Sequence, residues 1–346
     1  MPVVSAHSLK LYTEKILIAA GVPQAAAELI SDSLVSANLR GVDSHGVQLL
    51  PLYIQQIEQG NLDPQARGHV VSSDGACLLF DAECAFGQVA AAQACDHAVR
   101  LADEFGLGFV TVRNSNHFGA AAYWGTRMEA AGKIGIVFCN ASPLVAPWQA
   151  KQPVMGTNPI CVAVPGPWLL DMATSAVAYN KIYDAAMRNA PSIPEGWALN
   201  ASGGSASKPA EALKGSVMPL GGQVAGFKGS GLAAAVEILC SVLSGGPIGR
   251  EVGSMRSGGR MNVSQTFLAI DIKRFMPVEE FRQRVEHFVA MMKSTPPAEG
   301  YDEVLVAGDP QWRAERQRSI EGISIPEATW RLIARTADKL GISLAA

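Results

Sequence analysis

The chain of 346 residues is poor in several features that would place it in particular classes of protein. Charged residues make up only 17% of it and the net charge is -3, so no basic surface for nucleic acid is indicated. The six cysteines include no Cys-x-x-Cys pair, and we find neither a secretory signal nor an apolar run long enough to span a bilayer. We predict a cytoplasmic protein with reduced core cysteines that binds neither nucleic acid nor a membrane.

The common signatures of nucleotide and metal binding are also absent. No Gly-x-Gly-x-x-Gly follows a strand and opens a helix, and no Gly-x-x-x-x-Gly-Lys-Ser/Thr occurs. No His-x-x-x-His or other local spacing of metal ligands is present, so we predict no metal. If the protein binds a dinucleotide, it must do so without the usual dinucleotide fold.

The hydrophobic pattern predicts an α/β protein with a mixed sheet, because short apolar runs alternate with amphipathic segments. We expect helices over residues 5–20, 23–38, 90–105, 232–243, 281–292 and 327–340. We expect strands over residues 70–71, 77–80, 108–112, 134–138 and 160–164, with a hairpin turn at 72–75 and a loop at 200–209.

His45 is the first candidate for catalysis, in Asp43-Ser44-His45-Gly46 after the second expected helix. An imidazole with an ordinary pKa near 6.5 can donate a proton to an alkoxide and take it back, as reversible hydride transfer requires. Ser44 and Asp43 can orient the ring. The alternative is a histidine that only satisfies hydrogen bonds in a turn.

Two further polar tracts follow expected strands, where α/β proteins often assemble their sites. His117 lies within Asn114-Ser115-Asn116-His117-Phe118-Gly119 and can orient a substrate or brace a tight turn. Thr157 and Asn158 lie in Gly156-Thr157-Asn158-Pro159, which can also be a capping turn before the next strand. Together with His45, these tracts indicate an enzyme.

Phosphate binding is predicted at Lys228-Gly229-Ser230-Gly231, immediately before the apolar helix expected at 232–243. Free backbone N–H groups, the positive helix end and the Lys228 ammonium can converge on an anion there, although the segment can also be an ordinary Gly-rich helix start. The segment from Asp171 to Ser175 adds small side chains and polar groups suited to a ribose or an amide.

Nearly the whole chain resembles the malate/L-lactate dehydrogenase family of the non-Rossmann type, which includes sulfolactate, ureidoglycolate and diketogulonate dehydrogenases and piperideine-2-carboxylate reductases. Six segments carry the resemblance in order: Arg40–Gly46, Asn114–Gly119, Gly156–Pro159, Asp171–Ser175, Pro194–Ala198 and Phe227–Leu232. The resemblance implies NAD or NADP as cofactor, a homodimer, and a helical lobe made by the two ends of the chain. We therefore expect a lobe of residues 1–70 plus 311–346 and an α/β cofactor- and substrate-binding region over 71–310.

The resemblance also assigns roles to residues. His45 matches the proton donor, and His117, Asn158 and Ser44 are expected to complete the catalytic group. The residues expected to line the cofactor groove are Thr157, Asp171, Met172, Ala173, Thr174, Ser175, Phe227, Lys228, Gly229, Gly308 and Asp309.

The chain departs from the family pattern at several positions. Leu49 stands where many relatives have an arginine suited to a substrate carboxylate, and Arg40, Arg113, Lys181 or backbone N–H groups are the possible replacements. Trp148-Gln149-Ala150 replaces a common Gly-Gly pair, Asn180 replaces a frequent glycine, and Ala307-Gly308-Asp309 replaces Pro-Gly-Glu.

The predicted function is the interconversion of a small 2-oxo acid and a 2-hydroxy acid with NAD(P)H, His45 carrying the proton. One alternative is reduction of the C=N bond of a cyclic imino acid. Another is a non-catalytic protein that binds small molecules on the same fold.

Overall fold

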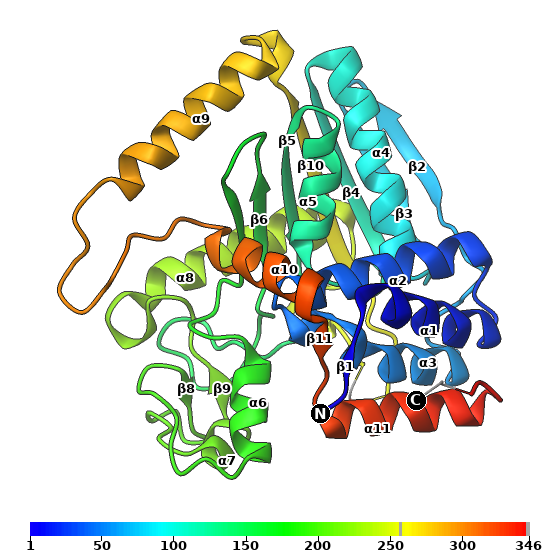
Figure 1. Cartoon of the computed structure of the whole chain (residues 1–346), viewed down its shortest axis with the longest axis vertical. Coiled ribbons are helices and arrows are strands. Elements are labelled where there is room, and N and C mark those ends of the chain that lie inside the picture. Colours follow the sequence, from blue (N-terminus) through cyan, green and yellow to red (C-terminus); the bar gives the residue numbers. More distant parts are fainter. Residues whose placement is uncertain (256–257, 344–346) are drawn as a thin grey trace.

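In the computed structural model, which describes residues 1–255 and 258–343, a seven-stranded mixed sheet forms the centre of the molecule (Figure 1). Its strand order is β2-β3-β4-β10-β5-β6-β7; β3 and β4 are parallel and the other neighbours are antiparallel. The strands of this sheet are β2 (His69–Asp74), β3 (Cys77–Asp81), β4 (Leu107–Ser115), β5 (Lys133–Cys139), β6 (Ile160–Ala163), β7 (Leu169–Met172) and β10 (Val263–Asp271).

Helices surround the sheet, and two short strand pairs lie outside it. The α-helices are α1 (Ala6–Ala19), α2 (Gln24–Leu39), α3 (Leu50–Glu58), α4 (Gly87–Phe105), α5 (Ala121–Ala130), α6 (Tyr179–Met187), α7 (Pro209–Ala212), α8 (Gly222–Glu237), α9 (Val278–Lys293), α10 (Asp309–Glu321) and α11 (Glu327–Lys339). The outer strands are β1 (Val3–Val4) with β11 (Ile323–Ser324), and β8 (Ala198–Leu199) with β9 (Ser216–Val217). The short helical turns are η1 (Asp43–His45), η2 (Val47–Leu49), η3 (Ile238–Val242), η4 (Gly249–Glu251) and η5 (Ile272–Arg274).

Strand β10 is covered on both faces. Phe267 belongs to the core cluster that the sheet forms with α4 and α5, whereas the neighbouring Thr266 donates from Oγ1 to the carbonyl of Leu239 in η3, at 2.8 Å. Successive side chains of a strand point to opposite faces, so α4 and α5 lie on one face of β10 and η3 lies on the other. The sheet is thus held between helical layers, as expected for an α/β fold.

The two ends of the chain pack together, as Figure 1 shows for the blue and red segments. β1 pairs with β11, and a second core cluster joins α1, α2 and α3 to α11 through residues such as Leu34, Leu50 and Ile333. The predicted mixed sheet and the helical lobe built from both termini are confirmed. The boundaries at residues 70 and 311 stay predictions.

A third, smaller core cluster lies in the segment between β7 and α8. Ile182 of α6, Ala212 of α7, Val217 of β9 and Ala198 of β8 pack together in it, and in Figure 1 this part stands apart from the sheet at the lower left. The loop predicted at residues 200–209 lies here, and α7 begins at its last residue.

Most of the expected helices and strands are confirmed, with four corrections. The hairpin turn consists of residues 75–76 and not of 72–75, because β2 continues to Asp74, which pairs with Cys77. The helix expected at 232–243 begins ten residues earlier, as α8. Cys77 is exposed, so not every cysteine is in the core; no disulfide occurs among the described residues. The sequence analysis also missed α3, α5, α6, α10, β7 and β10.

Helix α8 and η3 together form one helix, Gly222–Val242, that is long and apolar enough to cross a membrane by length and composition only. It is the one such helix among residues 1–255 and 258–343, and the expectation that no apolar segment has this length was wrong. Because the core helix of a soluble protein passes the same test, the finding is weak evidence for a membrane.

Candidate active site

His45 lies in the 3₁₀ turn η1, which follows α2 directly. The Ser44 hydroxyl is 2.9 Å from Nδ1 of His45, so the orienting role predicted for Ser44 is possible in this geometry. The next residue, Gly46, leaves no room for a side chain, because an added Cβ would lie 2.2 Å from Oδ1 of Asn38. That same Asn38 oxygen accepts the N–H of Val47 at 2.9 Å, which fixes the backbone on the far side of His45.

Asp43, the first residue of this turn, does not contact the His45 ring in any hydrogen bond of the structure. Its carboxylate accepts two hydrogen bonds from the Arg318 guanidinium, at 2.7 and 3.0 Å, and one from Nδ2 of Asn38 at 2.7 Å. Arg318 comes from α10, near the other end of the chain. The turn that holds His45 is therefore tied to two helices.

His117 follows β4 and is held through one ring nitrogen. The backbone N–H of Gly119 donates to its Nδ1 at 3.1 Å, and the Tyr53 hydroxyl lies 2.9 Å from the same nitrogen. Tyr53 in turn accepts from Nε2 of Gln88 at 3.0 Å. Since Nδ1 accepts the Gly119 N–H, the neutral ring carries its proton on Nε2, which leaves Nε2–H as the donor for a ligand.

The structure brings the two histidines together, with ring centroids 5.4 Å apart and the rings stacked at 29°. Burial lowers the pKa of His45 to about 4. Burial lowers the pKa of His117 to about 3, and the repulsion that a protonated His45 would exert contributes to this lowering. Both rings are therefore neutral at pH 7, and His45 is in the form that accepts a proton from a hydroxyl group.

Asn158 is completely buried, and its side chain is used within the protein. Its Oδ1 accepts the N–H of Ala141 at 3.1 Å, and its Nδ2 donates to the carbonyl of Ala233 at 3.0 Å and to Oε2 of the buried Glu237 at 2.9 Å. These contacts hold its loop against α8. A direct contact between Asn158 and a substrate stays a prediction.

The segment from Asp171 to Ser175 runs from the end of β7 along the Thr157 loop. The N–H and the hydroxyl of Thr174 donate to the carbonyl of Thr157 at 2.9 and 3.1 Å, and the Thr174 carbonyl accepts the N–H of Leu220 at 2.9 Å. Met172 and Ala173 are partly exposed, whereas Ser175 is buried and donates to the carbonyl of Val177. Thr157 and Thr174 are therefore adjacent, as the cofactor prediction requires.

Asp171 connects this segment to both histidine loops. Its Oδ2 accepts the N–H of Ala122, at the start of the helix that follows the His117 loop, at 2.8 Å. Burial of its carboxyl group raises the pKa of Asp171. The hydrogen bond from Ala122 and the positive charge of Arg40, which lies five residues before His45, lower it and partly offset the rise. Asp171 as a whole residue is exposed to solvent.

Phe227, Lys228 and Gly229 lie inside α8, so the expectation that they precede a helix was wrong. Ala225 has non-helical backbone angles (φ -130°, ψ 19°) that kink α8, and Phe227 and Lys228 are in the first turn after this kink. Phe227 is 55% exposed, and the Lys228 ammonium lies 5.9 Å from the centre of its ring. Gly229 packs directly on Leu220, where a Cβ would lie 2.4 Å from the backbone.

Gly308 and Asp309 form the start of α10, not an open loop. Gly308 has a left-handed backbone (φ 99°), and Trp312 leaves no space for a side chain there. Asp309 accepts the N–H of Val306 at 2.9 Å and pairs with Lys293 at 2.9 Å. The neighbouring Ala307 carbonyl accepts the N–H of Leu169 at the start of β7, which places this turn beside the strand that leads to Asp171.

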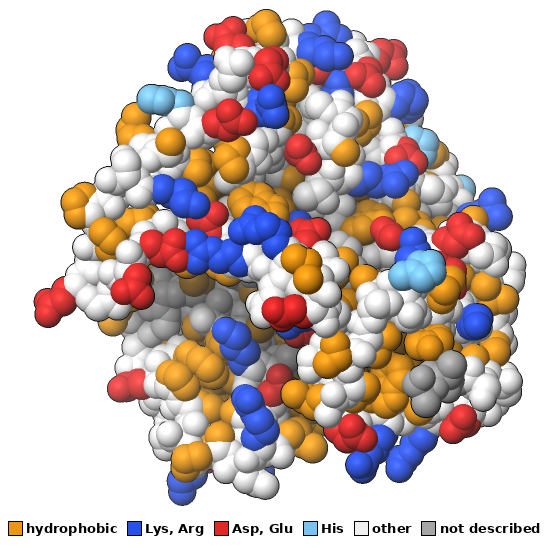
Figure 2. All heavy atoms as spheres, in the orientation of Figure 1, with side chains coloured by type: hydrophobic (Ala, Val, Ile, Leu, Met, Phe, Trp, Pro, Cys, Tyr) orange, Lys and Arg blue, Asp and Glu red, His pale blue; other side chains and the backbone are white. Residues whose placement is uncertain are grey.

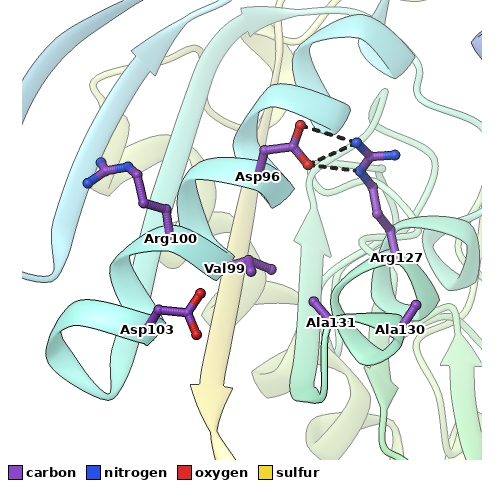
Figure 3. Close-up of a pocket in the computed structure, with 7 residues that line it drawn as sticks. All are labelled: Asp96, Val99, Arg100, Asp103, Arg127, Ala130 and Ala131. Carbon is purple, nitrogen blue, oxygen red and sulfur yellow. Dashed lines mark hydrogen bonds and ion pairs between the residues drawn. The ribbon is translucent and has the colours of Figure 1, made fainter.

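Two pockets open on the surface, and only the second lies near the predicted site residues. A groove of about 580 Å³ lies between α4 and α5, and Figure 3 shows its charged residues, among them Asp96 paired with Arg127. It contains none of the predicted site residues, and Arg127 is already neutralised. A second hollow, of about 470 Å³, is lined by Trp148, Gln149 and Pro219, and Pro219 pairs with Ser175 at the end of the predicted cofactor segment.

Comparison with known proteins decides the family. The family model described as malate/L-lactate dehydrogenase matches residues 4–334. A malate dehydrogenase of Pyrococcus horikoshii is 35% identical over 95% of this chain and 92% of its own length. The chain belongs to the malate/L-lactate dehydrogenase family.

Solved structures of the family have the same fold. A sulfolactate dehydrogenase from Methanocaldococcus jannaschii superposes with a TM-score of 0.92 and 33% identity, over 99% of this chain and 98% of that one. A delta1-piperideine-2-carboxylate reductase from Pseudomonas syringae superposes with a TM-score of 0.85 and 27% identity, over 97% and 100% of the two chains.

The residues predicted to line the cofactor groove have chemistry that fits a nicotinamide dinucleotide. Within residues 1–255 and 258–343 Lys228 forms no ion pair, so its ammonium is available to a phosphate, and the exposed Phe227 beside it offers an aromatic face. Figure 2 shows the surface hollowed beneath the start of α10, where Figure 1 draws α8. No cluster of three or more potential metal ligands occurs in the described part of the chain; the absence of a metal stays a prediction.

Sequence reasoning missed several residues that hold the candidate site. Tyr53 lies in α3, a helix that the sequence analysis did not predict, and it is 64 positions away from His117 in the sequence. Arg318 is one of several charged residues of α10, and Gln88 lies in an Ala-rich helix. Only Asn38, which ends a helix next to the His45 motif, carried a local signal, because asparagine at such a position often bonds the backbone that follows.

Proposed function

We propose that this protein is a nicotinamide-dependent oxidoreductase that interconverts a small 2-hydroxy acid and the corresponding 2-oxo acid. The stacked pair of His45 and His117 carries the proposal, since it places a neutral base and an oriented N–H donor side by side. Membership of a dehydrogenase family supports it. A non-catalytic binding protein has no need of such a pair.

In the oxidation direction, neutral His45 accepts the hydroxyl proton of the substrate, with Ser44 at its Nδ1 holding the ring. His117 donates from Nε2–H to the substrate oxygen, because its Nδ1 is occupied by the Gly119 N–H and the Tyr53 hydroxyl. A bound nicotinamide supplies the hydride acceptor in oxidation and the hydride donor in reduction. In the reduction direction His45 returns the proton.

The cofactor would be held by the groove residues of β7, the Thr157 loop and α8. Lys228 is proposed for a phosphate, Phe227 for an aromatic ring, and Asp171 with Met172 and Ala173 for a ribose or amide. NAD and NADP are both retained. Gly308 and Asp309 are proposed to border the same groove from the start of α10.

A carboxylate on the substrate needs a partner other than the arginine common in relatives. Leu49 is 4% exposed and packs in the second core cluster, so its position no longer contributes to a polar site. Arg113 is paired with Asp81 at 3.0 Å, and Lys181 is exposed on α6. We propose that Arg40 binds the substrate carboxylate, because its positive charge is close enough to Asp171 to lower the pKa of that side chain.

We also propose a cytoplasmic homodimer. The outward face of α8 and η3 supports the dimer, because Leu232, Ile238 and Val242 are 41 to 56% exposed along one helix. An apolar stripe of this kind is typical of a surface that a partner covers.

A second candidate activity is reduction of the C=N bond of a cyclic imino acid, which the likeness to the piperideine-2-carboxylate reductase supports. The test is to mix the purified protein with NADPH or NADH and follow the loss of reduced cofactor with a panel of 2-oxo acids and cyclic imino acids. Turnover of an oxo acid supports the dehydrogenase, and turnover of an imine alone supports the second candidate. Tight cofactor binding without turnover of either class contradicts both.

A further inference from the structure

Helix α10 contacts the turn that holds His45, and the inference drawn from this contact rests on the proposed function. We propose that Arg318 is a positioning residue for proton transfer: it fixes the Ser44–His45 turn by holding Asp43. Arg318 does not touch the imidazole; it acts through the carboxylate at the start of the turn.

The contact consists of several hydrogen bonds that converge on one short segment. Both terminal nitrogens of Arg318 donate to Asp43, one to each carboxylate oxygen, and one of them also donates to the carbonyl of Asn38. This two-pronged geometry suits a guanidinium and not an ammonium group. The fork holds the end of α2 and the first residue of η1 at the same time.

Asn38 connects Asp43, before His45, with the backbone of Val47, after His45. Its Nδ2 donates to Asp43 at 2.7 Å, and its Oδ1 accepts the N–H of Val47 at 2.9 Å. The residues on both sides of Ser44–His45 are thus held by one side chain that Arg318 and Asp43 keep in place. Gly46 permits this arrangement because any Cβ there would overlap the Asn38 amide.

Helix α10 also joins this turn to the proposed cofactor groove. Ala314 lies against Gly41, where an added Cβ would be 3.2 Å from its methyl group, and Trp312 packs on Gly308 at the start of the helix. Asp309 and Arg318 are separated by about 13 Å of helix axis at 1.5 Å per residue. A rigid helix therefore connects the turn at Gly308 with the turn at Asp43.

The ion pair is exposed enough that its effect on global stability is expected to be small. The side chains of Arg318 and Asp43 are 26% and 39% exposed, and pairs with such exposure add little to folding. A positioning role therefore predicts a loss of turnover that is out of proportion to any loss of stability. A purely structural role predicts the opposite.

The first test compares Arg318→Ala with Arg316→Ala, an exposed residue of the same helix that forms no ion pair within the described residues. We expect Arg318→Ala to lower kcat at least tenfold with the cofactor Kd and the melting temperature nearly unchanged, Arg318→Lys to recover part of the loss, and methylguanidine to restore activity partly to Arg318→Ala. Arg316→Ala should stay within twofold of the wild type. A kcat for Arg318→Ala within twofold of that control would overturn the proposal.

The second test needs no substrate, so it separates this proposal from the proposed function. Amide hydrogen exchange of Val47, whose N–H is bound by Asn38, is expected to be at least tenfold faster in Arg318→Ala than in the wild type or Arg316→Ala. Unchanged exchange at Val47 would overturn the positioning role even if the enzyme is active. A wild type that turns over no hydroxy, oxo or imino acid, together with the expected exchange result, would refute the proposed function and leave the contact intact.

Discussion

The hydroxyl of Tyr53 lies 2.9 Å from Nδ1 of His117, the same nitrogen that accepts the backbone N–H of Gly119. These two contacts leave Nε2 of His117 with the ring proton. The His117 ring is therefore oriented by α3 of the helical lobe, although His117 itself follows a strand of the central sheet.

Replacing Tyr53 by phenylalanine removes the hydroxyl and leaves the buried Nε2 of Gln88 without its acceptor. We expect kcat to fall roughly tenfold because His117 loses one of its two orienting contacts, and the free energy of unfolding to fall by about 1–2 kcal/mol. Steady-state kinetics and urea unfolding measure the two effects. Tyr301→Phe, at a position 73% exposed, is the control, and equal kcat values for the two variants would contradict the orienting role.

The pH dependence follows from the low pKa of His45, about 4 because of its burial. Oxidation needs the neutral ring, so its kcat/KM should rise with pH only below about pH 5 and be constant from pH 6 to 8. Reduction needs the protonated ring, so its kcat/KM should fall about tenfold for each unit of pH above the pKa. Measured profiles at saturating cofactor test both, and a reduction rate that is constant up to pH 8 would contradict this assignment.

Asn158→Asp should destabilise the fold strongly. The new carboxylate would face the carboxylate of Glu237, which now accepts from Nδ2 of Asn158 at 2.9 Å, and no water can screen the pair. We expect the free energy of unfolding to fall by about 3 kcal/mol or more. Asn189→Asp is the matched control, because Asn189 has a similar positive φ (52° against 34°) but is exposed. Similar unfolding midpoints for the two variants would show that Asn158 is not held in this network.

Lys228→Gln tests the cofactor groove without disturbing the core, because the ammonium is exposed and forms no ion pair in the described part of the chain. Loss of one phosphate contact should raise the Kd for NADH or NADPH about tenfold, equivalent to about 1.4 kcal/mol, with the melting temperature unchanged. Cofactor fluorescence titration measures the Kd. Lys214→Gln, an exposed lysine before β9, should leave it unchanged. Equal affinities of the two variants would exclude Lys228 from the groove.

The sequence predicted the parts of the site that depend on short motifs. His45, His117 and Thr157 each lie in a tract of small and polar residues next to a regular element, and such tracts mark loops whatever the rest of the fold is. The closeness of His45 and His117 was expected from the family resemblance and not from their spacing in the sequence. The stacked geometry of the histidines required the structure.

Elements stabilised by distant partners could not be predicted in this way. β10 lies at the centre of the sheet, yet it carries Ser264, Gln265 and Thr266, which read as a polar segment. Their partners are remote in sequence: Gln265 donates to the carbonyl of Asn116 at 2.9 Å. Local propensity cannot anticipate such contacts.

The start of α8 was missed for a related reason. Glycine is a poor helix former, so the Gly-rich segment before residue 232 was expected to precede the helix and not to belong to it. In the fold, Gly226 and Gly229 let the helix approach Trp148 and Leu220 more closely than any side chain would allow. Tertiary packing thus overrides the local preference.

The central claim is that His45 carries the proton, and His45→Gln tests it most directly, because glutamine keeps the polar character without an exchangeable imidazole proton. With the substrate found in the panel, we predict a loss of kcat of at least a hundredfold in both directions and a cofactor Kd within threefold of the wild type. Turnover within a few fold of the wild type would contradict the mechanism.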